Sequence, residues 1–273
     1  TGRVALVSSR RDMGILRDRK HQVAYKLLSG MFDRVITVAE SVRKFCIEKD
    51  GLRPERVVTI YNSVNDKLST VPDCWTVRRQ LGLSPHELVI TTVGHIRKVK
   101  GIDLLVESAA TLAREFPRLA FLVVGDAHEP DHFAELQDRI QKLNLSGIVH
   151  FLGPREDIPS ILSASDIFFL PSRSEGFSNA LIEAMICALP CVATDVGGNR
   201  EALRDAVNGF LIPSESKESA VQALSCLLRN DDLRKRMGQA SREIALLLFT
   251  PEALIQGVTA VYDAVLNERM RTL

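Results

Sequence analysis

The sequence predicts an α/β protein whose larger part is a doubly wound parallel sheet. Short apolar runs alternate with amphipathic helical patterns along most of the 273 residues, as strand–helix–strand units do. Runs such as Phe121–Val124 are apolar at every position, which is typical of strands buried on both faces. Each run ends in turn residues, so the following loops are expected to meet at one edge of the sheet, where such folds bind ligands.

The elements of this sheet follow from the apolar runs in order. Six strands are expected, at Val89–Val93, Phe121–Val124, Val149–Leu152, Ile167–Leu170, Cys191–Thr194 and Phe210–Ile212. Helical patterns fill the intervals, beginning with one over Ile102–Glu115.

The flanking segments predict further elements. Before the sheet we expect strands at Val4–Val7, at Asp33–Ala39 and within Arg56–Asn65, and a helix over Glu40–Lys49. After it, Thr250-Pro251-Glu252 predicts the start of a capped helix that reaches about Asn267.

Composition limits the classes of partner. With 45% apolar and 25% charged residues the chain can form a substantial core, and a formal net charge of +1 gives no electrostatic reason to expect nucleic acid as a partner. Five scattered cysteines favour buried thiols in a reducing compartment. No apolar run approaches the length of a bilayer span and no signal peptide opens the chain. We expect a cytoplasmic protein that is soluble or makes peripheral membrane contact.

The segment S-R-S-E-G-F-S-N-A-L-I-E, from Ser172 to Glu183, carries the strongest functional pattern. Glu175 falls in the turn after a predicted strand, Ser178 is a natural N-cap, and Glu183 lies about one turn inside the helix. Free amides and the positive end of the helix dipole therefore lie between two carboxylates. A ligand with hydroxyls at both ends and phosphate between them fits, and a nucleoside-diphosphate sugar is such a ligand.

A basic stretch follows the first strand of the sheet. G-H-I-R-K-V-K-G spans Gly94 to Gly101 and contains Arg97 and Lys100. Loss of a sugar from a nucleoside diphosphate leaves a dianion that needs a metal or fixed cations for stabilisation. No D-x-D pair occurs, so we expect no metal and no other cofactor, with Lys100 and Arg97 in that role.

His128-Glu129-Pro130-Asp131-His132 spells the zinc motif H-E-x-x-H. Zinc binding by this motif needs both imidazoles on one face of a continuous helix. Pro130 at its centre is expected to break that geometry, so the sequence argues against a zinc site.

Two of these segments resemble a known family. Residues 172–183, continued by A-M-I-C-A-L-P-C-V-A-T-D-V-G-G-N-R-E-A-L, resemble the E-x7-E signature region of the group 1 glycosyl transferases, or glycosyltransferase family 4, which are retaining enzymes. The basic stretch resembles the family's G-R-x-x-x-x-K-G. Lys100 matches, His95 stands where the family has Arg, and Arg97 lies two positions further on.

The resemblance implies a fold and a set of domains. The expected fold is GT-B-like, with a Rossmann-like C-terminal domain and a partial N-terminal α/β domain. The expected ranges are 1–66 for the remnant of the acceptor-side domain, 67–87 for a linker, 88–249 for the donor-binding domain, and 250–273 for a helix returning toward the first domain. Several βα units that open the family's first domain have no counterpart here. Arg10 or Arg11 falls where the family often has a His.

It also implies roles for individual residues. Glu175 is expected to meet sugar hydroxyls and to act in catalysis with Lys100 and Arg97. Glu183 is expected to meet the ribose, and Arg155 lies in a loop against the nucleobase, where it either stacks on the base or is solvated. The donor-binding set is completed by Gly94, Gly176, Phe177, Ser178, Asn179 and Ala180, several of them through backbone amides.

The sequence thus predicts a retaining glycosyltransferase that takes a UDP- or GDP-sugar and transfers the sugar to a hydroxyl of a carbohydrate or lipid-linked acceptor, in polysaccharide or glycoconjugate synthesis. Two alternatives stay open at this point. One is a nucleotide-sugar 2-epimerase of the same fold. The other is a non-catalytic fragment that binds nucleotide sugar or nothing.

Overall fold

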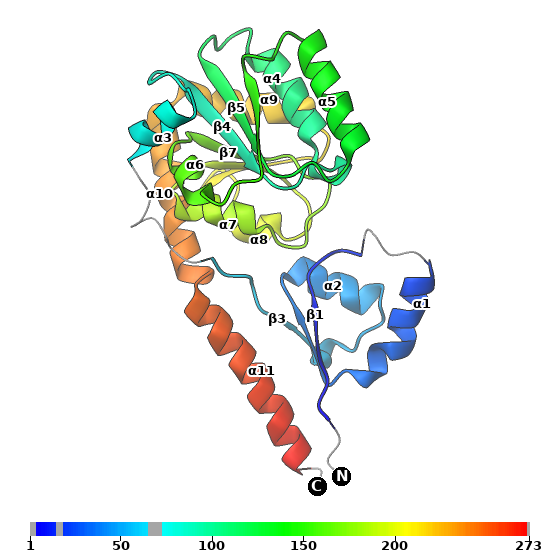
Figure 1. Cartoon of the computed structure of the whole chain (residues 1–273). Helices are drawn as coiled ribbons and strands as arrows, with labels where there is room; N and C mark the ends of the chain where they lie inside the picture. The colour runs from blue at the N-terminus through cyan, green and yellow to red at the C-terminus, as the bar shows by residue number, and fades with distance from the viewer. Residues whose placement is uncertain (1–3, 15–18, 65–72, 272–273) are drawn as a thin grey trace.

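The structure, a computed structural model, describes residues 4–14, 19–64 and 73–271. Within these residues the strands form two parallel sheets, one of six strands and one of three. Figure 1 shows two lobes, which we call the large lobe (residues 73–249) and the small lobe (residues 4–64 as described), with the long C-terminal helix α11 (Pro251–Arg271) running from the first alongside the second. The predicted α/β class with parallel sheets is confirmed.

The large lobe contains the six-stranded sheet, in the order β6-β5-β4-β7-β8-β9. Its strands are β4 (Leu88–Val93), β5 (Leu119–Val124), β6 (Val149–Gly153), β7 (Ile167–Leu170), β8 (Cys191–Thr194) and β9 (Gly209–Ile212). Strand order reverses between β4 and β7, so the loops that leave these two neighbours diverge to opposite sides and open a crevice at their carboxyl ends.

Helices cover both faces of this sheet. One core packs α4 (Ile102–Leu112), α5 (Pro130–Lys142) and α9 (Lys217–Arg229) against side chains such as Phe121 and Phe169. The opposite face packs Phe168 and Leu170 under α7 (Asn179–Ile186) and α10 (Asp231–Leu248). Two short helices, α3 (Cys74–Gln80) and α6 (Ile158–Ser163), complete that side, and α8 (Asn199–Ala202) follows β8. Alternate residues of one strand thus enter opposite cores, as the continuous apolar runs predict.

The small lobe is built on the three-stranded sheet β1-β2-β3. It contains β1 (Val7–Arg10), α1 (Arg19–Leu28), β2 (Arg34–Thr37), α2 (Glu40–Glu48) and β3 (Val57–Thr59), with single 3-10 turns at Ser29–Met31 and Pro54–Arg56. The far end of α11 is tied to this lobe by two ion pairs, Arg34 with Glu268 and Arg269 with Asp33.

Three predicted elements of the small lobe were placed wrongly. The first strand was expected at Val4–Val7, but β1 begins where that range ends, because Ser8, Ser9 and Arg10 pair with β2 although they are polar. The second is shorter than Asp33–Ala39. In the predicted Arg56–Asn65 strand only three residues pair, since the 3-10 turn takes up Arg56; Asn65 lies outside the described residues.

Three predicted helices have other ends, and the cysteines vary in burial. Helix α2 stops at Glu48 rather than Lys49, α4 stops at Leu112 rather than Glu115, and α11 continues to Arg271 beyond the expected end near Asn267. The Thr250 hydroxyl accepts the amide of Ala253 at 3.2 Å. Cys46 and Cys191 are buried as expected, but Cys226 is exposed, because it lies on the outer face of α9.

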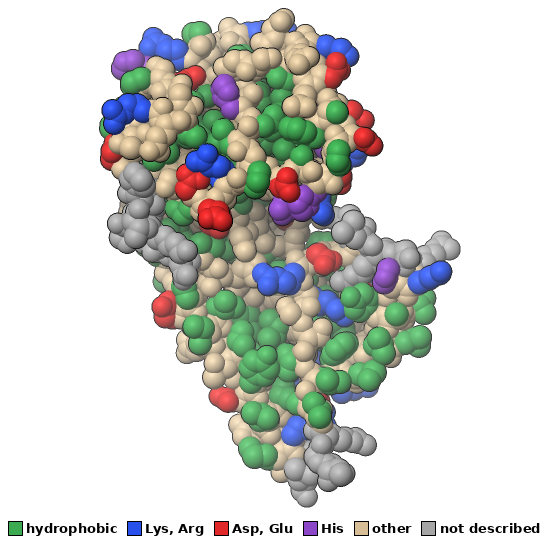
Figure 2. Space-filling view, in the orientation of Figure 1, with side chains coloured by type: hydrophobic (Ala, Val, Ile, Leu, Met, Phe, Trp, Pro, Cys, Tyr) green, Lys and Arg blue, Asp and Glu red, His purple; other side chains and the backbone are tan. Residues whose placement is uncertain are grey.

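The prediction that no apolar segment is long enough to span a bilayer is also wrong. Among the described residues one helical stretch, Asp231–Met270, is long and apolar enough, by length and composition, to cross a membrane. Only 17% of its most apolar part is buried. Core helices of soluble proteins pass the same test. The stretch joins α10 to α11 at Phe249–Pro251, and a proline at that point starts a new helix. Figure 2 shows many apolar side chains on the lower half of the molecule. Exposed apolar side chains among the described residues include Val23 and Leu27 of α1 and Ile255 and Leu266 of α11.

Candidate functional site

The carboxyl ends of β4 and β7 bring the two predicted segments together. The basic loop after β4 ends in a 3-10 turn, Lys98–Lys100, followed by Gly101 in the left-handed conformation with φ 65°. A side chain at Gly101 would place its Cβ 2.1 Å from the carbonyl oxygen of Pro171, and the amide of Arg173 donates to the carbonyl of Val99 at 2.7 Å. The glycine therefore allows the loops to touch.

Lys100 and Glu175 form the centre of this contact. The ammonium of Lys100 donates to Glu175 Oε1 at 2.6 Å, and the hydroxyl of Ser172 donates to the same oxygen at 2.7 Å. The Glu175 side chain is only 9% exposed and that of Lys100 24%, so the pair is shielded from solvent more than a surface ion pair. Gly94 lies against the stem of Lys100, since a Cβ there would be 3.6 Å from Lys100 Cε.

The helix that follows Glu175 begins as the sequence predicts. Ser178 is the N-cap of α7, and its side chain accepts a hydrogen bond from the amide of Leu181. Asn179 Oδ1 accepts from Asn62 Nδ2 of the small lobe at 2.8 Å. Phe177 is a buried core aromatic that packs at 5.2 Å on Tyr61 and at 5.3 Å on Phe249, measured between ring centroids. Three segments of the chain thus meet at this helix start.

Glu183 lies half-buried on the second turn of α7. Burial raises the pKa of its carboxyl above the ordinary value, because the charged form loses hydration. The described residues supply no ion pair for this carboxylate. A half-buried acid without a cation is a costly arrangement, and hydroxyls of a ligand would offset part of that cost.

Arg97 and His95 are arranged around His128. Arg97 Nη2 lies 2.9 Å from His128 Nδ1, and the rings of His95 and His128 stack with centroids 3.9 Å apart. Partial burial is the main cause that lowers the pKa of His95, and the neighbouring His128 and Arg97 lower it further. Arg97 is therefore held by an imidazole nitrogen and its positive charge is left without a carboxylate partner in the described part of the chain.

Two sequence features lie apart from this arrangement. Arg155 is exposed and makes a bidentate contact with Asp157, at 2.8 and 2.7 Å, so its guanidinium is occupied by its own loop. Pro130 begins α5 instead of interrupting a helix, so His128 lies outside the helix that carries His132. Among the described residues no group of three or more His, Cys, Asp or Glu could hold a metal ion.

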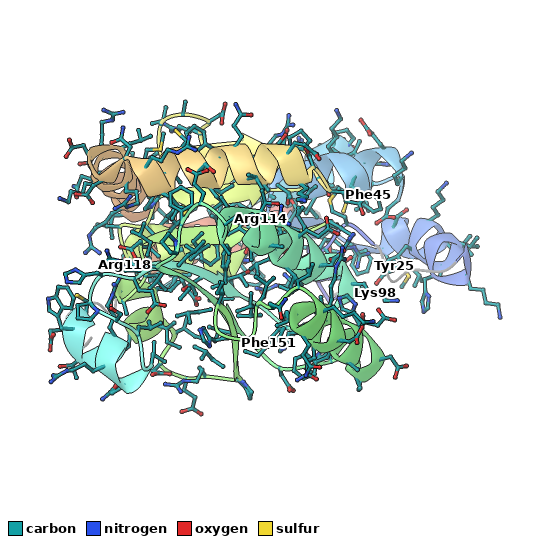
Figure 3. All side chains as sticks on the ribbon, turned by 90° about the horizontal axis from the view of Figure 1, so that it is seen from above. Tyr25, Phe45, Lys98, Arg114, Arg118 and Phe151 are labelled. Carbon is teal, nitrogen blue, oxygen red and sulfur yellow. The ribbon has the colours of Figure 1, made fainter. Side chains whose placement is uncertain are left out.

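A cleft of about 630 Å³ opens between the lobes beside Glu175. One wall comes from the small lobe (Arg11, Asp12, Met13, His21, Tyr25) and the other from the large lobe (Arg97, Lys98, Val99, Glu129, Ser174, Glu175, Gly176). In Figure 3 the labelled side chains of Tyr25 and Lys98 lie close together, one from each wall. Of the predicted site residues, Arg97, Glu175 and Gly176 line this cleft, whereas Lys100 reaches it only through its bond to Glu175.

Gly176 lets the lobes approach each other at this point. A Cβ at Gly176 would lie 2.0 Å from the carbonyl oxygen of Arg11. Gly197 and Gly198 pack in the same way on the backbone of Glu175 and Gly176. The sequence pattern contained no sign of the contact with Arg11, which joins distant segments.

Sequence reasoning missed several contacts of the site. Ser172 bonds Glu175, and Asn62 bonds Asn179. Ser172 could have been found, because it is a polar residue directly after a buried strand at the ligand-binding edge. Asn62 and Tyr61 carried no such signal.

Taken together, the two parallel sheets and the crevice at the β4–β7 switch point define a GT-B fold. The family model for glycosyl transferases group 1 matches residues 73–244, so the chain belongs to that family, as its sequence motifs predicted. Crystal structures of HepE from Anabaena, determined in complex with UDP and with UDP-glucose, are similar with a TM-score of 0.88 and 27% identity, covering 95% of this chain and 72% of that one.

Curated relatives are similar over a shorter part of their length. The chain is 27% identical over 212 residues to N-acetyl-alpha-D-glucosaminyl L-malate synthase of Bacillus anthracis, covering 78% of this chain and 55% of the relative. It is 33% identical over 218 residues to D-inositol 3-phosphate glycosyltransferase of Corynebacterium aurimucosum, covering 76% and 51%. The chain therefore spans about half the length of the curated relatives it matches.

Proposed function

We propose that the chain binds a nucleoside-diphosphate sugar at the β4–β7 crevice and, within the whole protein, transfers the sugar to a hydroxyl acceptor with retention of anomeric configuration. The observation that carries the proposal is the Lys100–Glu175 pair at 2.6 Å, located where the strand order reverses. It combines a cation for phosphate with a carboxylate for sugar hydroxyls in one place.

The donor is assigned to the large-lobe wall. Lys100 is assigned to the diphosphate, with Arg97 adding positive charge, and the amides from Gly176 to Ala180 lie at the start of α7, where a helix N-terminus favours phosphate. Glu175 is assigned to sugar hydroxyls and Glu183 to the ribose. In the transfer the bond between the anomeric carbon and the diphosphate oxygen breaks, a bond to the acceptor oxygen forms, and the acceptor proton is released. Stabilising the departing diphosphate lowers the barrier.

UDP-sugars are the preferred donors within this proposal, supported by the UDP and UDP-glucose complexes of HepE. GDP-sugars are the second class of donor that the binding test examines. The proposed acceptor is a carbohydrate or a lipid-linked molecule, and the reaction serves glycoconjugate synthesis without a metal ion. The proposed location is the cytoplasm, at the inner face of a membrane. The exposed apolar side chains of α1 and α11 support membrane contact, which sedimentation of the chain with phospholipid vesicles would test.

Calorimetric titration with UDP, GDP and ADP tests donor binding directly. We expect one of the three to bind with a dissociation constant in the micromolar to millimolar range, and binding of none would contradict the proposal and favour a non-catalytic fragment. Product analysis then separates transfer from 2-epimerisation, since an epimerase converts the sugar nucleotide without an acceptor. Proton NMR of the glycoside would report its anomeric configuration, and inversion would refute retention.

A further inference from the structure

The cleft between the lobes contains arginines that no carboxylate neutralises. Arg11 Nη2 donates to the amide oxygen of Asn62 at 3.4 Å, and Arg97 contacts His128 Nδ1 at 2.9 Å. Neither partner atom belongs to a carboxylate. Among the described residues neither guanidinium forms an ion pair, whereas Arg155, Arg173 and Arg200 each pair with an aspartate.

A third arginine lies behind the same wall. Arg10 is 8% exposed, its guanidinium stacks 3.9 Å from the ring centroid of Tyr25, and its Nε is buried without a hydrogen-bond partner. Tyr25 itself lines the cleft. Among the described residues no carboxylate pairs with Arg10. A buried guanidinium without a counter-ion is costly, and an anion bound nearby reduces that cost.

The acids of the cleft compensate for only part of this charge. Glu175 is bonded to Lys100 at 2.6 Å. Glu129 accepts the backbone amide of Lys98 at 2.9 Å, and Asp12 accepts the amide of Gly14 at 2.6 Å. The two amide bonds leave Glu129 and Asp12 charged, but the lining still holds three cations, Arg11, Arg97 and Lys98, against these two carboxylates, so the net charge of the lining is positive.

The position of Arg11 relative to Glu175 indicates what that charge is for. The Arg11 backbone rests on Gly176, and the open volume of about 630 Å³ lies between Arg11 and the large-lobe wall, a size typical of small-ligand sites. If the donor occupies the large-lobe wall with its sugar at Glu175, the acceptor hydroxyl approaches through this volume. We propose that the acceptor carries an anionic group, a phosphate or a carboxylate, which Arg11 binds with support from Arg10, while Arg97 stays with the donor diphosphate. This inference rests on the proposed function of the site.

The test uses three matched small molecules, glycerol 3-phosphate, glycerate and glycerol, titrated calorimetrically into the chain saturated with UDP. The variant is Arg11→Gln, and the control is Arg53→Gln, an exposed arginine of the same lobe outside the cleft. We expect at least one of the two anions to bind at least tenfold more tightly than glycerol, and to lose that preference in Arg11→Gln but not in Arg53→Gln. Which of the two binds more tightly identifies the anionic group.

Three outcomes would overturn the inference. The first is equal binding of all three compounds, and the second is an unchanged preference in Arg11→Gln. The third is loss of anion binding when UDP is present, which would mean that Arg11 and Arg10 bind the donor diphosphate instead. UDP affinity is measured separately in both variants and should be unchanged. If UDP does not bind the unmodified chain, the proposed donor site fails on that measurement, and the anion titration repeated without UDP still decides whether Arg11 recognises the anion.

Discussion

Glu201 of the large lobe caps a helix of the small lobe, accepting the backbone amide of Glu40 at 2.7 Å although the two residues are 161 positions apart. Its second oxygen accepts the amide of Ser41 at 2.9 Å. The residue at the N-cap of α2 is Ala39, which provides no side-chain cap. The Glu201 carboxylate also lies near Tyr61. Burial, and to a smaller extent the negative charge of Glu201, raise the pKa of the Tyr61 hydroxyl to about 12. The first amides of α2 are therefore satisfied by a side chain of the other lobe.

Replacing Glu201 by alanine should destabilise the chain through this contact. Loss of an N-cap costs about 0.5–2 kcal/mol, and we expect a decrease of that size in the free energy of unfolding by urea. The control is Glu218→Ala, an exposed acid in the first turn of α9, whose removal should change the stability by less than about 0.5 kcal/mol. Equal effects of the two substitutions would mean that the contact between the lobes contributes nothing.

Lys100→Met should weaken both the donor site and the fold around it. The change removes the cation assigned to the diphosphate, and loss of one such group typically lowers kcat about 10²- to 10³-fold. It also leaves the 9% exposed Glu175 side chain without its counter-ion, so we expect reduced thermal stability as well as reduced UDP affinity.

A matched control for Lys100 is available on α5. Lys142 pairs with Asp138 at the same distance, 2.6 Å, but the two side chains are 74% and 59% exposed. Exposed pairs contribute about 0–1 kcal/mol, so Lys142→Met should leave stability, UDP affinity and turnover nearly unchanged. Normal kinetics of Lys100→Met in the complete enzyme would refute the phosphate assignment.

The large lobe was predictable because its strands are short, mostly apolar runs. β7 and β8 have the predicted bounds, since Ile167–Leu170 and Cys191–Thr194 are buried at every position and flanked by turn residues. The convergence of Lys100 with Glu175 also followed from the sequence, because carboxyl ends of parallel strands share one edge.

The small lobe and the contacts between lobes could not be predicted in the same way. β1 is polar, and its pairing with β2 depends on hydrogen bonds rather than on an apolar pattern. The contacts of Glu201 with Glu40 and of Gly176 with Arg11 join segments with no local signature. The sequence does not decide whether Arg155 stacks on a nucleobase or is solvated. Its contact with Asp157 is a third state that only side-chain geometry reveals.

Glu183→Gln should stabilise the ligand-free chain at neutral pH while weakening UDP binding. Burial raises the pKa of this carboxyl in the folded chain above its unfolded value. The folded state therefore binds the proton more tightly, and stability rises as pH falls through the window between the two pKa values. Above that window the charged, half-buried carboxylate is destabilising, and a neutral amide removes the penalty.

The pH dependence separates this effect from a general change in packing. The gain in melting temperature of Glu183→Gln should be largest near pH 7 and should disappear below the unfolded pKa, about 4.3, where the wild-type carboxyl is protonated in both states. Melting temperatures at pH 7 and pH 4 test this. A gain that is the same at both pH values would rule out desolvation of the charge as its cause.

Gly176→Ala should disrupt the contact between the small lobe and the Glu175 loop. The new Cβ would lie 2.0 Å from the Arg11 carbonyl oxygen, so the two backbones must separate, and overpacking of this kind costs about 1–3 kcal/mol. Because Gly176 also lines the cleft, we expect anion binding at Arg11 to weaken together with stability. Gly147→Ala is the matched control, since nothing lies within 4 Å of a Cβ there. Urea unfolding that is unchanged in both variants would mean that the Arg11 loop does not rest on Gly176 in solution.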